Sequence, residues 1–334
     1  MLTKRSLQNL FRVIRGGLAG QGFLNPRVDK IISDLKAQST SGAEGALFNF
    51  TIDFELCWGN AKRGVCDIPF KERVEAAKIQ AENFFPFVEL LEELNFPISW
   101  AVLGRLAHSE DRLAPEHKFA PPWARSDWYK KPSNAEVPSE YWDGKTYLET
   151  LKKRLPFCEI LSHGYAHIDY SDPTTTADIA ENDLKLSKSA LEEFGFDVSG
   201  FVYPCNRQGY LELLNPSGYF ISRGSDQDWH FLPNLIQTPL GFWMSPGVMS
   251  FKDVSRVIDQ GICSKAYIHP WIHLIECSLK CNDLKNFYRP LFEKILEEQA
   301  RGRIRNVSFS EIRKLNLHDV KRDQSVDKYP HAGR

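Results

Sequence analysis

The segment ALFNFTIDFE, residues 46–55, sets the fold class, because it is a short apolar strand that ends on acidic side chains. An amphipathic helical pattern follows at 71–95, and PISWAVLG (97–104) has the continuous apolar character of a buried strand. A strand, a helix and a second strand in this order predict a parallel βαβ unit. The main domain therefore begins as an α/β protein.

The alternation of strands and helices continues along the chain, with no visible internal repeat. Further strand patterns lie at 157–167, 197–206, 220–226, 265–271 and 304–312, and helical patterns lie at 176–195 and 284–303, the latter bent near Pro290. Such alternation is typical of a parallel barrel or a wound sheet. We expect one domain over 46–316, preceded by an N-terminal extension with a loop-like linker (1–45) and followed by a polar tail (317–334).

The composition excludes several classes of protein. Of the 334 residues, 42% are hydrophobic, which is too many for a disordered chain, and no stretch approaches the roughly 18 apolar residues of a membrane-spanning helix. A net charge of −1 gives no general reason to bind nucleic acid. The seven scattered cysteines do not resemble a disulfide scaffold. We expect a soluble cytoplasmic protein with reduced thiols.

The first 28 residues are basic, because no acidic side chain precedes Asp29. Apolar residues recur at helical spacing over 1–20, which predicts a basic amphipathic helix. Three interpretations stay open: a helix packed on the main domain, a peripheral contact with an anionic inner-membrane surface, or a transit-type segment.

Polar side chains follow several of the predicted strands. In parallel α/β folds, chemistry is placed at the carboxyl ends of strands. The polar residues at these predicted strand ends are Asp53, Glu55, His163, His167, Asn206, Arg207, Arg223, Asp226 and His269. Several strands thus deliver functional side chains to one rim.

His163 and His167 are four residues apart, so one loop or helical turn can aim both imidazoles at a single ion. A carboxylate from another strand would complete the two-His, one-carboxylate set of catalytic zinc sites. Asp53 and Glu55 flank Phe54 and point the same way from a strand, about 6–7 Å apart, so one can bind metal while the other accepts a proton. Alternatively, the histidines are hydrogen-bonded loop residues and the acids cap a helix.

His269 lies in IHPWIH (268–273), where Pro270 disfavours helical geometry and the preceding apolar residues bring the imidazole out of the core. It is either a functional histidine or a satisfied core histidine. His273 lies further along the loop, and an exchange of roles between the two histidines stays open.

Four motifs together resemble a known family. TIDFE (51–55), SHGYAH (162–167), FVYPCNRQG (201–209) and AYIHP (266–270) occur in the order and spacing of the polysaccharide deacetylases, the NodB-homology domain of carbohydrate esterase family 4. The resemblance covers roughly 46–316 and implies a distorted (β/α)7-type, TIM-like barrel. It is greatest for the divergent intracellular branch of surface-polysaccharide and lipopolysaccharide biosynthesis.

The resemblance implies a role for each matching residue. Asp53 would be the general base, His269 the general acid, and Glu55, His163 and His167 the ligands of one divalent metal ion, with zinc expected before other transition metals. Glu55 stands in for the family's second acid, whose position holds Phe54.

The third motif departs from the family pattern. Val202 occupies the position of the arginine that pairs with the base, and Arg207 or Arg223 would replace it from another direction. Asp226 or Asp228 would orient the late histidine, and backbone N–H groups after Pro204, at Cys205 and Asn206, would help to hold an oxyanion. Aromatic side chains that either stack on a sugar ring or belong to the core are Trp128, Tyr129, Trp142 and Trp271.

The function implied is metal-dependent removal of an N-acetyl or N-formyl group from an amino sugar in a surface-polysaccharide or glycolipid precursor that is nucleotide-, lipid- or glycan-linked. Two alternatives stay open. One is another C–N hydrolase on the same scaffold, acting on a cyclic amide or as a deformylase. The other is a carbohydrate-binding homologue without catalysis, an idea motivated by the replaced arginine and the shifted acid.

Overall fold

A computed structural model describes residues 25–37, 45–59, 62–63, 66–67, 70–108, 119–122 and 137–315. The predicted basic helix over 1–20 and the polar tail over 317–334 lie outside these residues. Within them, no helix has both the length and the apolar character needed to cross a membrane.

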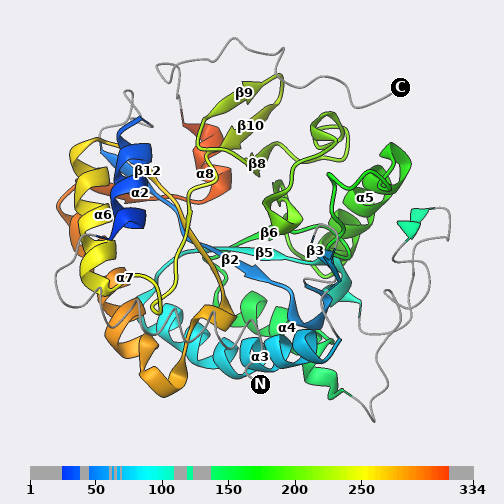
Figure 1. The fold of residues 1–334 in the computed structure, drawn as a ribbon, viewed down its shortest axis with the longest axis horizontal. Helices are drawn as coiled ribbons and strands as arrows, with labels where there is room; N and C mark the ends of the chain where they lie inside the picture. Colours follow the sequence, from blue (N-terminus) through cyan, green and yellow to red (C-terminus); the bar gives the residue numbers. More distant parts are fainter. Residues whose placement is uncertain are drawn as a thin grey trace.

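The centre of the molecule is a strongly curled nine-stranded sheet, which confirms the predicted α/β, distorted-barrel fold (Figure 1). All neighbouring strands are parallel except the β9–β10 hairpin. In spatial order the strands are β11 (Phe242–Trp243), β13 (Pro270–His273), β2 (Thr51–Phe54), β5 (Ser99–Val102), β6 (Glu159–Ser162), β7 (Gly200–Val202), β8 (Ile221–Arg223), β10 (Leu235–Thr238) and β9 (His230–Leu232).

A smaller parallel sheet extends the first one, in the order β12 (Tyr267–Ile268), β1 (Ala46–Phe48), β14 (Ile304–Asn306). Each of the predicted strands at 46–54 and 265–271 is therefore two strands in two sheets. The Asn49 side chain lies at the first break, where Nδ2 donates to Ser99 Oγ (3.1 Å) and to the Val307 carbonyl (2.6 Å). An antiparallel pair, β3 (Lys62–Arg63) and β4 (Cys66–Asp67), stands apart.

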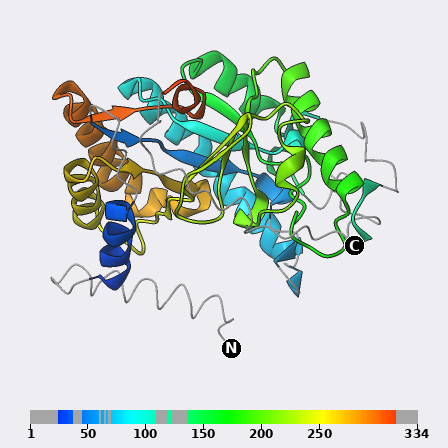
Figure 2. The same cartoon turned by 90° about the horizontal axis from the view of Figure 1, so that it is seen from above.

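Helices cover the outside of the curled sheet (Figures 1 and 2). They are α3 (Phe70–Leu94), α4 (Lys145–Arg154), α5 (Ala177–Glu193), α6 (Phe251–Cys263), α7 (Arg289–Ala300) and α8 (Phe309–Lys314). The helix predicted over 284–303, interrupted or bent near Pro290, is the π-helix η10 (Leu284–Tyr288) followed by α7, with Pro290 in the first turn of α7. In α3, Phe84, Val88 and Leu91 share one fully buried face, as the helical periodicity requires.

Short 3₁₀ helices make several of the connections. They are η1 (Leu56–Trp58), η2 (Gly104–Ala107), η5 (Ser139–Tyr141), η6 (Pro204–Asn206), η7 (Leu211–Leu213), η8 (Leu274–Glu276) and η9 (Leu279–Cys281). Residues 227–264, for which the sequence patterns predicted no element, contain β9, β10, β11 and α6. A capping box between Ser250 and Asp253 begins α6.

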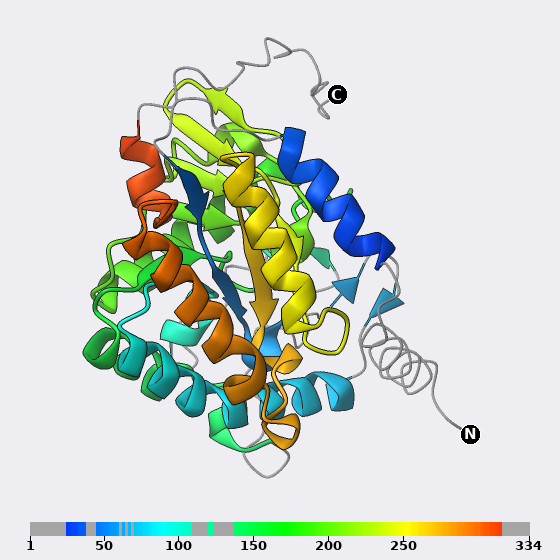
Figure 3. The ribbon, with the colours of Figure 1, turned by 90° about the vertical axis from the view of Figure 1, so that its left-hand side faces the viewer.

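The linker predicted as loop-like contains a helix, α2 (Pro26–Ala37). Proline is favoured in the first turn of a helix, so Pro26 begins this helix rather than breaking it. Val28, Ile31 and Leu35 lie on one buried face, which packs against α6 (Figure 3). The α2 helix thus belongs to the folded domain.

Candidate metal centre

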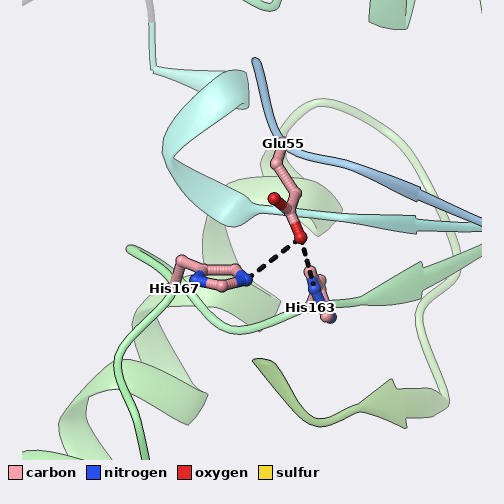
Figure 4. Close-up of side chains that lie close together, drawn as sticks. All are labelled: Glu55, His163 and His167. Atoms are coloured by element: carbon pink, nitrogen blue, oxygen red, sulfur yellow. Dashed lines mark hydrogen bonds and ion pairs between the residues drawn. The ribbon is translucent and has the colours of Figure 1, made fainter. Parts of the chain in front are cut away.

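Three buried side chains from the ends of two strands that flank β5 converge on one point (Figure 4). Glu55 directly follows β2, and His163 and His167 follow β6. Glu55 Oε1 lies 3.1 Å from His163 Nε2 and 3.0 Å from His167 Nε2. Each residue can offer one ligand atom such that all three atoms lie within 4.8 Å of one another.

The donor chemistry of this cluster fits a divalent metal ion. His163 Nδ1 lies 2.8 Å from the Val202 carbonyl, which can only accept, so Nδ1 carries the proton in the neutral ring. In that neutral ring the lone pair of Nε2 faces the Glu55 carboxylate, and a metal cation between them, like a second ring proton, makes the contact attractive. Ligands bound at about 2.0–2.1 Å on a tetrahedral ion are roughly 3.3 Å apart, close to the 3.1 and 3.0 Å between Glu55 Oε1 and the two imidazole nitrogens.

The loop that carries the two histidines is held by a buried carboxylate on α5. Asp183 accepts hydrogen bonds from the Tyr165 N–H (2.8 Å), the Ala166 N–H (3.3 Å) and the Tyr170 hydroxyl (2.7 Å). The loop also needs left-handed backbone at Gly164 (φ +76°) and at His167 (φ +55°). Left-handed backbone at a histidine is a local strain of the kind found at functional sites.

Asp53 lies beside the cluster and is clamped by Arg223. Arg223 Nη1 donates to Oδ1 at 3.0 Å and Nη2 to Oδ2 at 2.6 Å, and both side chains are buried. Burial alone raises the pKa of Asp53, but Arg223, with smaller contributions from His163 and His273, outweighs burial and lowers the pKa below the usual value. The carboxylate is therefore ionised at neutral pH.

The structure distinguishes the two arginines that the sequence left open. Arg223, at the end of β8, contacts Asp53, donates to Asn206 Oδ1 (2.8 Å) and lies 5.0 Å from the centre of the Trp271 ring. Arg207 instead donates through Nη1 to Asp169 at 2.7 Å, with its own side chain 43% exposed at the mouth of the site.

The two late histidines have different positions. His273 ends β13 opposite Asp53, and its Nε2 lies 3.4 Å from Glu55 Oε1 while its Nδ1 lies 3.4 Å from Glu276 Oε2. Burial lowers the pKa of His273, but Glu55 and Glu276 outweigh burial and raise it well above the usual value.

His269 lies four residues earlier and does not reach the metal cluster. Its Nε2 is 2.7 Å from the Thr51 hydroxyl, and its Nδ1 is 3.4 Å from the Pro239 carbonyl. Burial, with the nearby positive charge of Arg223, lowers the pKa of His269 to about 3, so the ring is neutral.

A cavity of about 260 Å³ opens over the cluster. The residues that line it come from four separate segments and are Asp53, Glu55, His167, Cys205, Asn206, Arg207, Trp271 and His273. His273 is therefore at the cavity, and His269 is not among its lining residues.

Three further groups do not have the contacts that were predicted for them. The Asp226 carboxylate contacts His230 Nε2 at 3.0 Å, so it does not orient a late histidine. The Asn206 N–H donates to the Tyr203 carbonyl (3.1 Å) and is not free for an oxyanion. Trp142, considered as a sugar-stacking wall, is only 2% exposed in the core, and Trp128 and Tyr129 lie outside the described residues.

Glu276 and Asp183 are site residues that the sequence analysis missed. Asp183 lies mid-helix and gives no signal in sequence, whereas Glu276 lies three residues after His273, a spacing at which its carboxylate accepts from the His273 N–H at 2.6 Å.

Sequence searches find no matching protein-family model and no matching curated protein. Solved structures do share the fold. The chain superposes on a protein of Mycobacterium smegmatis that carries a provisional assignment as a polysaccharide deacetylase, with a TM-score of 0.51, 13% identity, and coverage of 83% of this chain and 92% of that one.

Two further structures have a similar fold. The PuuE allantoinase gives a TM-score of 0.54 with 10% identity, over 81% of this chain and 90% of that one. A 4-α-glucanotransferase of Thermococcus litoralis gives 0.52 with 13% identity, over 82% of this chain and 41% of that one. At these identities the likeness shows that the chain has the NodB-type distorted barrel fold, and the reaction has to be argued from the site.

Proposed function

We propose that this protein is a metal-dependent hydrolase that removes the acyl group from an N-acylated amino sugar. The observation that carries the proposal is the meeting, in one cavity, of the Glu55–His163–His167 cluster with an ionised Asp53 and with His273. Metal-assisted amide hydrolysis needs metal ligands, a general base and a general acid. The two-His, one-carboxylate cluster, the separate carboxylate and the separate imidazole supply these three functions.

Glu55, His163 and His167 would hold the divalent ion, with zinc the first candidate. When bound, such an ion polarises an amide carbonyl and lowers the pKa of a coordinated water towards ~7. Val202 supports this role by fixing the tautomer of His163, and Asp183 supports it by holding the backbone of the histidine loop.

Asp53 would accept the proton of the attacking water. The two hydrogen bonds from Arg223 keep the carboxylate ionised and fix its orientation towards the cavity. Position 202 holds valine in place of the family's arginine, but Arg223 forms the ion pair with Asp53 instead. The valine at position 202 is therefore no argument for a non-catalytic homologue.

His273, rather than His269, would protonate the departing amine. His273 lines the cavity, and Glu276 lies on the far side of its ring, where it holds the imidazole in place. We therefore assign the general-acid role to His273, which the register of β13 places opposite Asp53, and not to His269.

A second candidate is hydrolysis of another C–N bond on the same scaffold. The fold likeness to the PuuE allantoinase favours this candidate, because the proposed groups attack an amide without requiring that it be attached to a sugar. Trp271 at the cavity favours the sugar, since an aromatic face stacks on the apolar face of a pyranose ring.

We further propose that this activity is cytoplasmic and that the basic segment 1–20 binds an anionic membrane surface. Sedimentation with anionic vesicles tests this placement. The full chain should co-sediment and a chain lacking residues 1–24, which keeps α2, should stay in solution, whereas equal partitioning would reject the contact.

The test of the proposed reaction is a panel of N-acetyl and N-formyl sugars, free and phosphate-linked, together with allantoin. Purified protein supplied with different divalent ions should release free amine and carboxylate from at least one sugar. Asp53→Asn should keep the metal and lose the release. Turnover of allantoin alone would favour the second candidate, and equal turnover by Asp53→Asn would remove Asp53 from the mechanism.

A further inference from the structure

A second and larger cavity lies next to the candidate metal centre. It has a volume of about 430 Å³ and lies between α2 on one side and β11 with the loop before it on the other. Trp271 lines both this groove and the cavity over the metal cluster. Trp271 therefore separates two neighbouring cavities, one over the metal cluster and one against α2.

Aromatic side chains form the wall between the two cavities. Trp243 of β11 and Trp271 of β13 are register partners on neighbouring parallel strands, so their side chains leave the sheet on the same face. The Arg27 guanidinium lies 4.8 Å from the centre of the Trp243 ring, and its Nη2 donates to the Trp243 carbonyl at 2.8 Å. These contacts fix Arg27 at the groove.

The opposite wall carries positive charge from α2. Arg27 and Lys30 line the groove, one helical turn apart, against a single acid, Asp34. No ion pair of the Lys30 ammonium is formed with any residue in the described part of the chain. The other acid of this helix, Asp29, is already paired with Arg256 at 2.8 Å. The groove therefore offers the Lys30 ammonium to a ligand.

We propose that this groove binds a phosphate or diphosphate group on the amino sugar whose acyl group is removed over the metal cluster. The inference rests on the proposed function and adds the substrate class, a glycosyl phosphate or diphosphate. Arg27 and Lys30 supply charge-assisted hydrogen bonds to phosphate oxygens, and Trp243 and Trp271 support the group that connects them to the sugar. The phosphate belongs either to a nucleotide or to a lipid carrier.

Calorimetric titration of the full metal-loaded chain tests the groove independently of activity. The probes are inorganic pyrophosphate, uridine diphosphate, and farnesyl diphosphate presented below its aggregation concentration. Lys30→Glu should weaken phosphate binding by roughly 5- to 30-fold, since it reverses one charge at the site. Lys36→Glu is the matched control, because Lys36 is an exposed lysine of the same helix that does not line the groove. It should leave the dissociation constants unchanged.

The two arms of the titration distinguish the source of the phosphate. Tighter binding of uridine diphosphate than of pyrophosphate indicates a nucleotide, and tighter binding of farnesyl diphosphate indicates a lipid carrier. Trp243→Leu should weaken whichever of these two binds more tightly and leave pyrophosphate less affected, because only the larger probe reaches the ring.

Two results would overturn the groove proposal. One is the absence of saturable binding by any of the three probes, and the other is equal weakening by Lys30→Glu and Lys36→Glu. Phosphates that bind only the metal ion would give affinities independent of Lys30, which also rejects the groove. If Lys30-dependent binding occurs and no N-acyl sugar is hydrolysed, the groove stands and the proposed reaction fails.

Discussion

His269 and His273 are separated by three residues of one extended segment, yet they lie in opposite environments. His269 is fully buried between a hydroxyl and a carbonyl, and its pKa falls to about 3. His273 meets two carboxylates at the cavity, and its pKa rises. At about 3.3 Å per residue the two positions are roughly 13 Å apart, so only one of them can serve the same site.

The difference shows how burial changes the pKa of an imidazole when carboxylates contact it and when none does. Desolvation disfavours the imidazolium at both positions, but only His273 has carboxylates within 3.4 Å to offset that cost. His269 is thus a neutral structural group, and His273 is a charged group at the cavity.

The largest expected effect is on turnover. His273→Gln should lower kcat for the best N-acyl substrate by roughly 10²–10⁴, the usual contribution of a general acid. His269→Gln, the matched control, should keep kcat within roughly tenfold, because its ring does not line the cavity. Steady-state assays of amine release decide the matter, and the reverse ranking would return the acid role to His269.

The next effect is on stability as a function of pH. The unfolded chain protonates His269 below about pH 6.5, whereas the folded chain protonates it only near pH 3. The unfolded state therefore binds more protons in this window, and stability falls as the pH drops through it.

This contribution is isolated by comparing the wild type with His269→Gln in urea unfolding. The free-energy advantage of the wild type should shrink by roughly 2 kcal/mol between pH 7 and pH 5, because the variant lacks the group that titrates. A pH-independent difference between the two proteins would show that His269 titrates normally in the fold.

A smaller effect concerns the hydroxyl that satisfies His269. Thr51→Val removes the partner of Nε2 at 2.7 Å and leaves a buried imidazole nitrogen without it. The free energy of unfolding should fall by about 1–2 kcal/mol. Chemical denaturation measures this loss, and the metal content should not change. Thr51→Ser, which keeps the hydroxyl, should lose less stability, and an equal loss would point to packing rather than the hydrogen bond.

The smallest effect concerns the orientation of His273. Glu276→Gln keeps the shape of the side chain but removes its charge, so kcat should fall by roughly tenfold with little change in KM. Glu297→Gln, at an exposed glutamate of α7, is the control and should have no effect on turnover. A rise in KM at constant kcat would instead assign Glu276 to substrate binding.

Much of the metal cluster could be predicted because its signals are local. Two histidines four residues apart and an acid at the end of a buried strand need only parallel strands to bring them together. The identity of the late histidine depends on register, since the break at His269 divides β12 from β13 and places His273 opposite Asp53. A sequence pattern does not contain that register.

Other parts of the site depend on contacts between distant segments. Arg223 reaches Asp53 across the curl of the sheet, and Asp183 reaches the histidine loop from the middle of α5. Neither contact corresponds to a recognisable spacing of residues in the sequence. The α2 helix was missed for a different reason: Pro26 indicates a turn in isolation, and only the buried face of α2 against α6 reveals a first-turn proline.

The metal content of the purified protein tests the central claim most directly. Elemental analysis after dialysis against zinc should find roughly one ion per chain in the wild type and almost none in the His163→Ala/His167→Ala double variant. Circular dichroism should show that both proteins are folded. The same bound zinc in both folded proteins would contradict the assignment of the Glu55–His163–His167 cluster as the metal centre.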